Sequence, residues 1–432
     1  MIDINIIRND KEKVIKNLKN KFQDHKIKTL DEIIDLDKKV RELKLKGDEL
    51  RKEKNNLSSE IGLLMRDKKV EEANKNKVRV VEINDELIHI EEDENKYNEE
   101  LKAKMMTIPN IIDDSVPIGK DDTENVENKR YGEAIVPDYE IPYHADICDK
   151  FNGLDKESAG RTSGNGFYYL MGDIARLHSA MLSYARDFMI DKGFTYCIPP
   201  FMIRSDVVNG VMSFEEMDAM MYKIEGEDLF LIGTSEHSMI GKFKNQLLKE
   251  TELPITLTSY SPCFRKEVGS HGLEERGIYR VHQFEKQEMV VLCKMEDAMT
   301  WYNKMWSYTV EFFRSLDIPV RTLECCSGDL ADLKVKSCDV EAWSPRQQKY
   351  FEVGSCSTLG DAQARRLGIR AKGESGTNYV ATLNNTVLAT PRGLIALIEN
   401  NYTKEGNIKV PKALQPYMGG KEVIKGTNGQ LN

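Results

Sequence analysis

The chain has 432 residues, which is more than one average domain needs and enough for two or three. Charged residues make up 31% of it and hydrophobic residues 40%, a composition typical of globular proteins and not of disordered ones. No apolar run approaches the roughly 18 residues of a transmembrane helix, and Asp3 interrupts any apolar signal segment at the N-terminus. The sequence therefore predicts a cytoplasmic protein with no membrane partner.

The net charge is 62 − 71 = −9, which excludes a uniformly basic nucleic-acid coat but leaves room for a local basic surface. The eight cysteines include no Cys-x-x-Cys pair, and the seven histidines include no His-Glu-x-x-His motif. Because zinc sites usually have such spacings, we expect no zinc and interpret the cysteines as small buried side chains.

The first quarter of the chain predicts a long helical hairpin. Apolar residues recur every three or four positions over residues 36–64, where only Gly47 and Lys54 interrupt them, and again over residues 73–101. The short polar segment 65–69 lies between the two stripes. This pattern predicts an antiparallel coiled-coil arm, roughly 50–60 Å long at about 1.5 Å per residue.

Basic residues outnumber acidic ones over residues 38–54 and 66–79, whereas residues 91–94 are all acidic. Charge alone leaves two interpretations open: a solvated helical face, or a basic arm that binds a polyanion. Residues 111–140 are rich in Asp, Glu, Asn, Pro and Gly, and we expect them to form a linker.

From about residue 141 onward, short aromatic and β-branched runs alternate with turns, and residues 171–192 and 294–316 have a helical pattern. The predicted strands do not alternate strictly with helices, which favours an α+β domain built on a mostly antiparallel sheet flanked by helices. The chain contains neither a Gly-x-x-x-x-Gly-Lys-Ser/Thr loop nor a Gly-x-Gly-x-x-Gly turn. Any nucleotide must therefore be bound by side chains instead of a glycine-rich cradle.

Two predicted strands carry side chains suited to such a site. In Phe264-Arg265-Lys266-Glu267, alternation would place Arg265 and Glu267 on one face, where a guanidinium beside a carboxylate can hold a phosphate and a base or sugar. In segment 280–288, alternation places four side chains on one face: His282, Phe284, Lys286 and Glu288. An aromatic ring and a carboxylate on that face suit a base and an ammonium group. A structural Arg–Glu pair and an ordinary amphipathic strand are the competing interpretations.

The third segment, 382–392, ends at Arg392 and precedes an apolar helix over residues 393–400. An arginine at a helix N-terminus opposes the helix dipole unless it faces an anion. Arg392 is therefore the strongest single candidate for a functional residue on physical grounds.

Together these segments closely resemble the seryl-tRNA synthetases, a family of class II aminoacyl-tRNA synthetases. The resemblance covers almost the whole length and includes the helical arm, Ile108-Pro109-Asn110, Thr234-Ser235-Glu236, the three segments above and Pro416-Tyr417-Met418. It implies a tRNA-binding domain over residues 1–110, a linker over 111–140 and a class II catalytic domain over 141–432.

The resemblance also implies roles for single residues. Arg265 matches the family arginine that holds the ATP α-phosphate, and Arg392 matches the one that covers the adenine and reaches the γ-phosphate; both are expected to be catalytic. Phe284 matches the ring that stacks on adenine, and Val281 a backbone contact to it. The ATP-binding residues are expected to be Arg265, Lys266, Glu267, Val281, Phe284, Glu352, Val353, Gly354, Ser355 and Arg392. The serine-binding residues are expected to be Thr234, Ser235, Glu236, Arg265, Glu288, Asn384 and Thr386.

The implied activity is a serine–tRNA ligation. ATP and L-serine form seryl-adenylate and pyrophosphate, and serine then passes to the 3′ end of tRNA(Ser), and of tRNA(Sec) where it is present. The substrate carboxylate is itself the nucleophile, so alignment and charge neutralisation can carry the catalysis. Glu352 and Ser355 match the family's ligands for a Mg²⁺ ion that accompanies ATP.

The resemblance implies two further partners. Residues 193–200 match the family's dimer-forming motif, so we expect a homodimer. Only 432 − 392 = 40 residues follow Arg392, and we expect no anticodon-binding domain among them. The basic arm is therefore expected to hold the long variable arm of the tRNA by its backbone and shape.

Four positions depart from the family pattern: Ala381 where His is common, Thr358 where Asn is frequent, Ala362 where an aromatic residue is usual, and Pro391 where Gly or Thr is usual. They bear on pocket shape and leave the charged candidates intact.

Three alternative functions remain open. The first is a ligase with a non-tRNA acceptor, against which the arm argues, and the second is a duplicate enzyme that still charges tRNA. The third is an inactive scaffold, against which the complete set of charged candidates argues.

Overall fold

The computed structural model describes residues 1–267, 277–374 and 376–426. Contacts divide the chain into two compact units, one formed by Ile2–Pro109 and the other by Met1 with Asn110–Asn432. Within the described ranges, no helix combines the length and the apolar character needed to cross a membrane.

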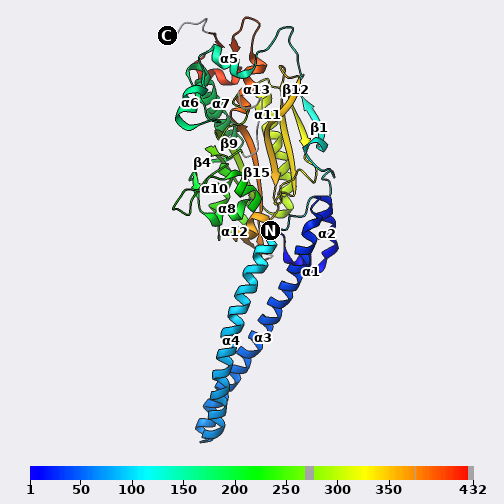
Figure 1. Cartoon of the computed structure of the whole chain (residues 1–432), viewed down its shortest axis with the longest axis vertical. Coiled ribbons are helices and arrows are strands. Elements are labelled where there is room, and N and C mark those ends of the chain that lie inside the picture. The colour runs from blue at the N-terminus through cyan, green and yellow to red at the C-terminus, as the bar shows by residue number, and fades with distance from the viewer. Residues whose placement is uncertain (268–276, 375, 427–432) are drawn as a thin grey trace. The chain divides into compact units, whose positions relative to one another are not determined.

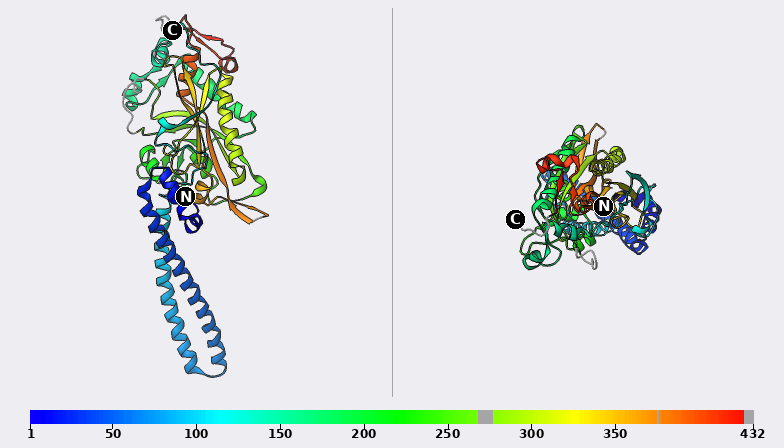
Figure 2. Two further views of the ribbon diagram at one scale, coloured as in Figure 1. Left: turned by 90° about the vertical axis from the view of Figure 1, so that its right-hand side faces the viewer. Right: turned by 90° about the horizontal axis from the view of Figure 1, so that it is seen from above.

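The first unit is helical. Its helices are α1 (Ile4–Asn9), α2 (Lys11–Asn20), α3 (Ile27–Arg66) and α4 (Val70–Met105), with a 3₁₀ turn η1 (Asp24–Lys26) before α3. Helices α3 and α4 pack against each other as an antiparallel hairpin (Figure 1 and the left view of Figure 2). The 40 residues of α3 give it a length of about 60 Å. The hairpin predicted from the two apolar stripes is thus present.

The seam of the hairpin is narrow. Its buried cluster consists of Leu50 from α3 and Ile83, Leu87 and Ile90 from α4. Gly47, which interrupts the apolar stripe, lies in this seam because a Cβ atom there would approach Ile90 Cγ2 to 3.6 Å. Ion pairs flank the cluster and join the two helices, such as Arg79 Nε with Glu53 Oε1 at 2.8 Å.

The second unit is built on an eight-stranded sheet. The strands follow in the order β1 (Val126–Tyr131), β10 (Val320–Glu324), β11 (Lys336–Ser344), β12 (Lys349–Thr358), β15 (Ala381–Ala389), β9 (Gln283–Cys293), β8 (Ile255–Phe264) and β4 (Thr195–Cys197). All neighbours are antiparallel except β4 and β8, which are parallel. This is the mostly antiparallel α+β architecture predicted from the sequence.

Both faces of the sheet are covered, as the alternation along β9 illustrates. Met289, Val291 and Cys293 belong to the main core. That core forms where α7 (Gly172–Asp191), α11 (Ala298–Ser315) and α13 (Arg392–Asn401) pack on the sheet. Val290 and Leu292 point to the opposite face and belong to a second cluster. The helices that pack around this second cluster are α8 (Ser205–Val211), α10 (Ser235–Gly241) and α12 (Ala362–Leu367).

Shorter elements complete the unit. The remaining helices are α5 (His144–Lys150), α6 (Lys156–Ser163) and α9 (Phe214–Met220). The small sheets pair β2 (Leu154–Asp155) with β3 (Tyr169–Leu170), β5 (Met202–Ile203) with β6 (Phe230–Leu231), β16 (Ile408–Lys409) with β17 (Val423–Ile424), and β13 (Arg370–Gly373) with both β14 (Gly376–Tyr379) and β7 (Leu247–Lys249).

Residues 111–140, expected to be a linker, supply the edge strand β1 of the large sheet. Five of its six residues are exposed, and a polar strand at a sheet edge has no apolar alternation by which to recognise it. The segment also contributes Ile112 and Val116 to a small buried cluster with Cys325 and Leu330.

Candidate active site

Two adjoining cavities lie on the sheet face opposite the main core. The first has a volume of about 640 Å³, including its mouth, and its lining includes Tyr279, Phe284 and Arg392. The second has a volume of about 920 Å³, and its lining includes Thr234, Glu236 and Glu288. The two cavities share four lining residues: Arg265, Lys286, Glu352 and Thr386. A ligand can therefore extend from one cavity into the other past these side chains.

The candidate ATP residues gather around the first cavity. Those that line it are Arg265, Glu267, Val281, Phe284, Glu352, Val353, Gly354 and Arg392. Ser355 lines the second cavity instead. Lys266 is absent from the linings of both, and its Nζ donates to the backbone oxygen of Asp218 at 3.3 Å.

The candidate serine residues gather around the second cavity. Those that line it are Thr234, Glu236, Arg265, Glu288, Asn384 and Thr386. Ser235 is fully buried beside them, and its Oγ has no hydrogen-bond partner in the part of the chain that the structure describes.

Arg265 lies just beyond a strand. The expected alternation along a strand through Glu267 is wrong, because β8 ends at Phe264 and Glu267 has a φ of +47°, in the left-handed region. The turn still brings Arg265 to the site: its Nε donates to the backbone oxygen of Gly233 at 3.2 Å, and its guanidinium lies 5.2 Å from the centre of the Phe284 ring. A guanidinium held this way presents its remaining donors to the shared wall of the cavities.

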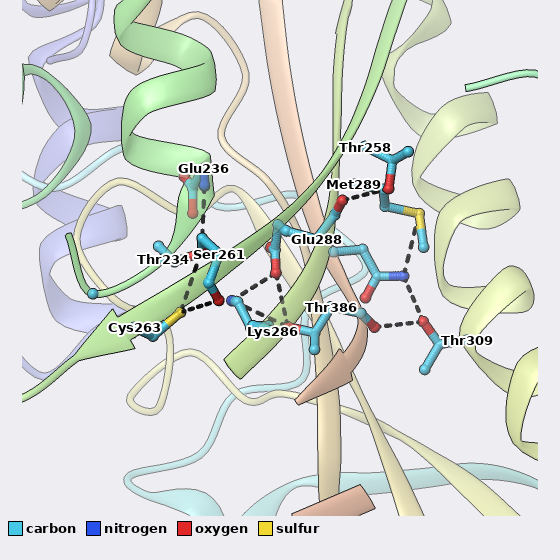
Figure 3. A network of polar contacts seen from close by, with 12 residues as sticks. Thr234, Glu236, Thr258, Ser261, Cys263, Lys286, Glu288, Met289, Thr309 and Thr386 are labelled. Atoms are coloured by element: carbon cyan, nitrogen blue, oxygen red, sulfur yellow. Dashed lines mark hydrogen bonds and ion pairs between the residues drawn. The ribbon is translucent and has the colours of Figure 1, made fainter. Parts of the chain in front are cut away.

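The alternation predicted along β9 holds for three of its four residues. Phe284, Lys286 and Glu288 line the cavities in sequence order, whereas His282 precedes the strand. Lys286 Nζ lies 2.6 Å from Glu288 Oε2, and both side chains are almost fully buried. Thr386 Oγ1, on β15, donates to Glu288 Oε2 at 3.2 Å (Figure 3). Sequence reasoning placed Lys286 on this face but did not assign it to the serine site.

The Glu236 carboxylate of the second cavity is strongly affected by its burial. It lies in the first turn of α10, whose N-cap Thr234 accepts the Glu236 backbone N–H at 3.4 Å. Burial, and next the Glu288 carboxylate, raise the pKa of Glu236 to about 7. Gln363 Nε2 donates to Glu236 Oε1 at 2.8 Å and offsets part of this rise. Nothing in the sequence pattern pointed to Gln363 beyond its place next to the departure at Ala362.

Arg392 pairs with Glu352 across the first cavity. The Arg392 side chain leaves the first residue of α13, and its Nη1 lies 2.9 Å from Glu352 Oε2. Its guanidinium also lies 4.5 Å from the centre of the Tyr279 ring, an aromatic that sequence reasoning missed. Desolvation in the cleft disfavours the Glu352 carboxylate, but the charge and hydrogen bond of Arg392 outweigh it and hold the pKa of Glu352 below its ordinary value.

Oxygen donors suited to a divalent cation gather at β11 and β12. Asp339 on β11 lies opposite Ser355 on β12, in the same ladder that carries Glu352. Burial, and next the Glu352 carboxylate, raise the pKa of Asp339 to about 7. Two carboxylates that repel each other beside a hydroxyl form a hard oxygen set that fits Mg²⁺.

Cys325 and Asp329 also lie near Asp339, and one ligand atom of each of the three falls within 4.8 Å of the others. Burial, the largest effect, together with Asp339, raises the pKa of the Cys325 thiol far above its usual range. The thiol is therefore a poor metal ligand at neutral pH.

His237 is a further residue of the second cavity that sequence reasoning missed. Its imidazole lines the cavity, and its Nδ1 lacks a hydrogen-bond partner among the described residues. Burial, then the charges of Arg265 and Lys286, lower the pKa of His237 to about 3, so the ring is neutral at physiological pH. Of the four departures from the family pattern, Pro391 lines the first cavity; Ala381, Thr358 and Ala362 are buried outside both linings.

Comparisons with known proteins cover nearly the whole chain. The profile "Seryl-tRNA synthetase N-terminal domain" matches residues 1–112, and "tRNA synthetase class II core domain (G, H, P, S and T)" matches residues 220–401. The serine--tRNA ligase of Methanocella arvoryzae is 38% identical over 429 residues, or 98% of this chain and all of the relative. That of Thermococcus sibiricus is 40% identical over 447 aligned residues, covering 98% of each chain.

Two solved structures are similar over their full length. The seryl-tRNA synthetase of Pyrococcus horikoshii, complexed with ATP, has a TM-score of 0.93 and 36% identity over 99% of this chain and all of that one. The cytoplasmic serine–tRNA ligase of Naegleria fowleri, in complex with AMP, has a TM-score of 0.87 and 31% identity over 99% of each chain.

Proposed function

Because the chain belongs to the seryl-tRNA synthetase family, we propose that it activates L-serine with ATP in the two adjoining cavities and then transfers serine to the 3′ end of tRNA(Ser). The observation that carries this proposal is the wall that the cavities share. ATP occupies the first cavity and serine the second, and the reacting atoms meet at Arg265, Lys286, Glu352 and Thr386. The mixed anhydride of seryl-adenylate spans that wall.

Arg265 and Arg392 neutralise the phosphates. Arg265, anchored on Gly233 and next to the Phe284 ring, faces the point at which the serine carboxylate attacks the α-phosphorus. Phe284 offers its ring to the adenine, and Arg392, fixed by Glu352, stabilises the charge of the departing pyrophosphate. Fixed donors aimed at developing charge lower the barrier without reorganising during the reaction.

Glu236 and the Lys286–Glu288–Thr386 group select serine. The Glu236 carboxylate binds the substrate ammonium, and the buried polar group around Glu288 binds the side-chain hydroxyl. Alanine would leave these buried partners unpaired, a penalty that rejects it strongly. Threonine is excluded only by the space that its extra methyl group requires, which is the weaker form of selection.

Glu352 and Ser355 are the residues that hold Mg²⁺ in this proposal, and Asp339 adds a third oxygen donor. Bound Mg²⁺ would supply charge neutralisation for the phosphate oxygens of ATP. Glu352 is then both a metal ligand and the partner that orients Arg392.

Residues 1–110 serve as the tRNA-binding domain in this proposal, and residues 141–432 as the catalytic domain. Several lysines of the hairpin support this role because they are exposed and form no ion pair with any residue that the structure describes; they are Lys44, Lys46, Lys52, Lys68, Lys75 and Lys77. Arg51 and Arg79 are instead engaged with glutamates of the hairpin. The free lysines can contact the phosphates of a long variable arm.

We also infer a homodimer formed through the β4 edge of the large sheet. Strand β4 ends the eight-stranded order, and apolar side chains surround it: Ile198 is 70% exposed, Met202 48% and Ile190 44%. An unpaired strand edge with exposed apolar neighbours is suited to pairing with a second copy.

The proposal is tested by ATP–pyrophosphate exchange on the full chain with serine, threonine, cysteine, alanine and glycine. Exchange that depends on serine alone, followed by transfer of serine to tRNA(Ser), is the expected result. Exchange with none of the five amino acids would overturn the assignment of the cavities.

A further inference from the structure

Lys334 is a charged residue of the second cavity that the mechanism above does not use. It lies between β10 and β11 and lines the cavity together with Glu352 and Ser355. Its Nζ makes one long hydrogen bond, 3.4 Å to Ser337 Oγ. No carboxylate oxygen in the described ranges comes within 4.0 Å of it, in contrast to Lys286, whose Nζ is 2.6 Å from Glu288.

The ammonium of Lys334 is held in place and charged. Ser337 Oγ, its hydrogen-bond partner, lies 3.0 Å from Ser357 Oγ and 3.3 Å from Ser355 Oγ, so it is fixed to β12. Burial opposes the charge, but the negative field of Asp339 and other acidic groups more than offsets it and keeps the pKa of Lys334 above its ordinary value. A charged group in such a place is stabilised by an anion that enters the cavity.

The charged side chains that line the second cavity indicate which anion Lys334 binds. Its carboxylates are Glu216, Glu236, Glu288 and Glu352, and its cations are Arg265, Lys286 and Lys334. Lys286 already forms an ion pair with Glu288, and Arg265 faces the α-phosphate in the proposed reaction. An amino acid carries a carboxylate of its own into this acidic surrounding, and Lys334 is the cation that remains to receive it.

We propose that Lys334 is a positioning residue that pairs with the carboxylate of the free amino acid before the adenylate forms. The inference rests on the proposed function, because it takes serine to occupy the second cavity. The inference adds Lys334 to the substrate site and states the step of the reaction in which Lys334 acts.

The chemistry limits this contact to the steps before the adenylate is complete. When the carboxylate oxygen bonds to the α-phosphorus and the bond from phosphorus to pyrophosphate breaks, the carboxylate becomes a neutral acyl group. Lys334 then loses its ionic partner. A contact that persists up to the transition state, in which the carboxylate keeps most of its charge, and that ends only in the adenylate lowers the KM for serine and leaves kcat unchanged.

The test compares Lys334→Met and Lys334→Arg with wild type in the full chain. Lys349→Met is the matched control, since Lys349 is an exposed lysine at the start of β12, the strand that carries Glu352 and Ser355. ATP–pyrophosphate exchange gives kcat and the KM for serine and for ATP. Calorimetry gives the affinity for 5′-O-[N-(L-seryl)sulfamoyl]adenosine, which resembles the adenylate and has no free carboxylate.

Loss of a charged partner should raise the KM for serine by at least about ten-fold in Lys334→Met. The KM for ATP, kcat and the affinity for the sulfamoyl compound should stay within about two-fold of wild type, Lys334→Arg should recover most of the KM, and Lys349→Met should change nothing. The retained affinity for the sulfamoyl compound also establishes that the variant is folded.

An unchanged KM for serine in Lys334→Met would overturn the inference. Equal loss of affinity for serine and for the sulfamoyl compound would also overturn it, because Lys334 would then act on the phosphate or on the fold. If Lys334→Met does not fold, a Lys334→Arg protein with wild-type KM and kcat supports the inference, and one with a ten-fold lower affinity for the sulfamoyl compound overturns it. Exchange in the wild-type protein is measured before any variant is compared. If it does not depend on serine, the proposed function itself is overturned.

Discussion

Arg392 and Glu352 join the N-terminus of α13 to strand β12 through a hydrogen-bonded ion pair of 2.9 Å. The pair gives Arg392 the anion that a basic residue at the start of a helix requires, because the helix dipole there is positive. It also fixes the guanidinium over Tyr279, at the edge of the first cavity. The two residues should therefore act as a unit.

Loss of either partner of this pair should cost nearly as much as loss of both. We expect Glu352→Gln and Arg392→Met each to reduce ATP–pyrophosphate exchange roughly 100-fold, with the double variant little worse than either, because the pair couples the two sites. A double-mutant cycle on kcat/KM for ATP measures this. Purely additive effects would contradict the coupling.

Arg265→Ala should nearly abolish adenylate formation. Removal of one fixed donor at a site of developing charge costs about 2.7–4 kcal/mol, or roughly 100- to 1000-fold in rate. Exchange assays with saturating serine and ATP give the loss directly. Lys349→Ala is the control, because Lys349 is exposed at the start of β12 and lines neither cavity; exchange at wild-type rates in Arg265→Ala would refute the assignment.

The KM for serine should fall as the pH rises from 6 to 8. The pKa of Glu236 is raised to about 7, so below that pH the carboxyl is protonated and loses its attraction for the substrate ammonium. Above it the carboxylate is ionised and the KM levels off. Glu236→Gln should give a higher KM that no longer changes over this range, and an unchanged profile in that variant would assign the titration to another group.

The free lysines of the hairpin should set the salt dependence of tRNA binding. Each phosphate contact contributes about 0.7–0.9 to the slope of log K against log salt, so Lys44, Lys46 and Lys52 changed together to Gln should flatten it by roughly two. Filter binding over a range of KCl concentrations measures the slope. A triple change at Lys349, Lys372 and Lys409, which are exposed lysines of the second unit, is the control and should leave it unaltered. Equal slopes in the two triple variants would mean that the hairpin lysines are only solvated.

Ile198→Arg should convert the proposed dimer to a monomer, since it places a charge at the exposed apolar surface beside β4. Light scattering coupled to size exclusion reports the mass. Ile135→Arg, at a residue that is 63% exposed elsewhere on the same unit, should leave the mass unchanged. A wild-type protein that is monomeric at micromolar concentration would remove the basis for this interface.

The hairpin and the α+β sheet were predictable from the sequence because each rests on a periodic pattern. The heptad stripe marks α3 and α4, and the two-residue alternation along β9 assigns Phe284, Lys286 and Glu288 to one face. Where the pattern stops, the prediction failed: β8 ends at Phe264, so the positions of Arg265 and Glu267 depend on a turn and not on alternation.

Other features depend on contacts distant in sequence. Lys334, Asp339 and Gln363 come to the site from a loop, a neighbouring strand and a helix, each through tertiary packing that no local pattern encodes. The edge strand β1 was missed because its side chains are exposed on both faces. The roles of the charged residues came from resemblance and remain predictions for the experiments above.

The seam of the hairpin has a consequence for how it behaves. Between Leu50 and Ala73, which covers the end of α3, the turn and the start of α4, no residue is fully buried. Apolar burial is what protects a helix pair from local opening, so the tip should open far more often than the segment around Ile83 and Ile90. Amide protons there should exchange quickly in the free protein and slow on binding RNA. Ordering of the tip on binding would then cost conformational entropy, which the binding enthalpy measured by calorimetry would have to offset. The tip would also adapt to variable arms of different length without any change in the rest of the chain.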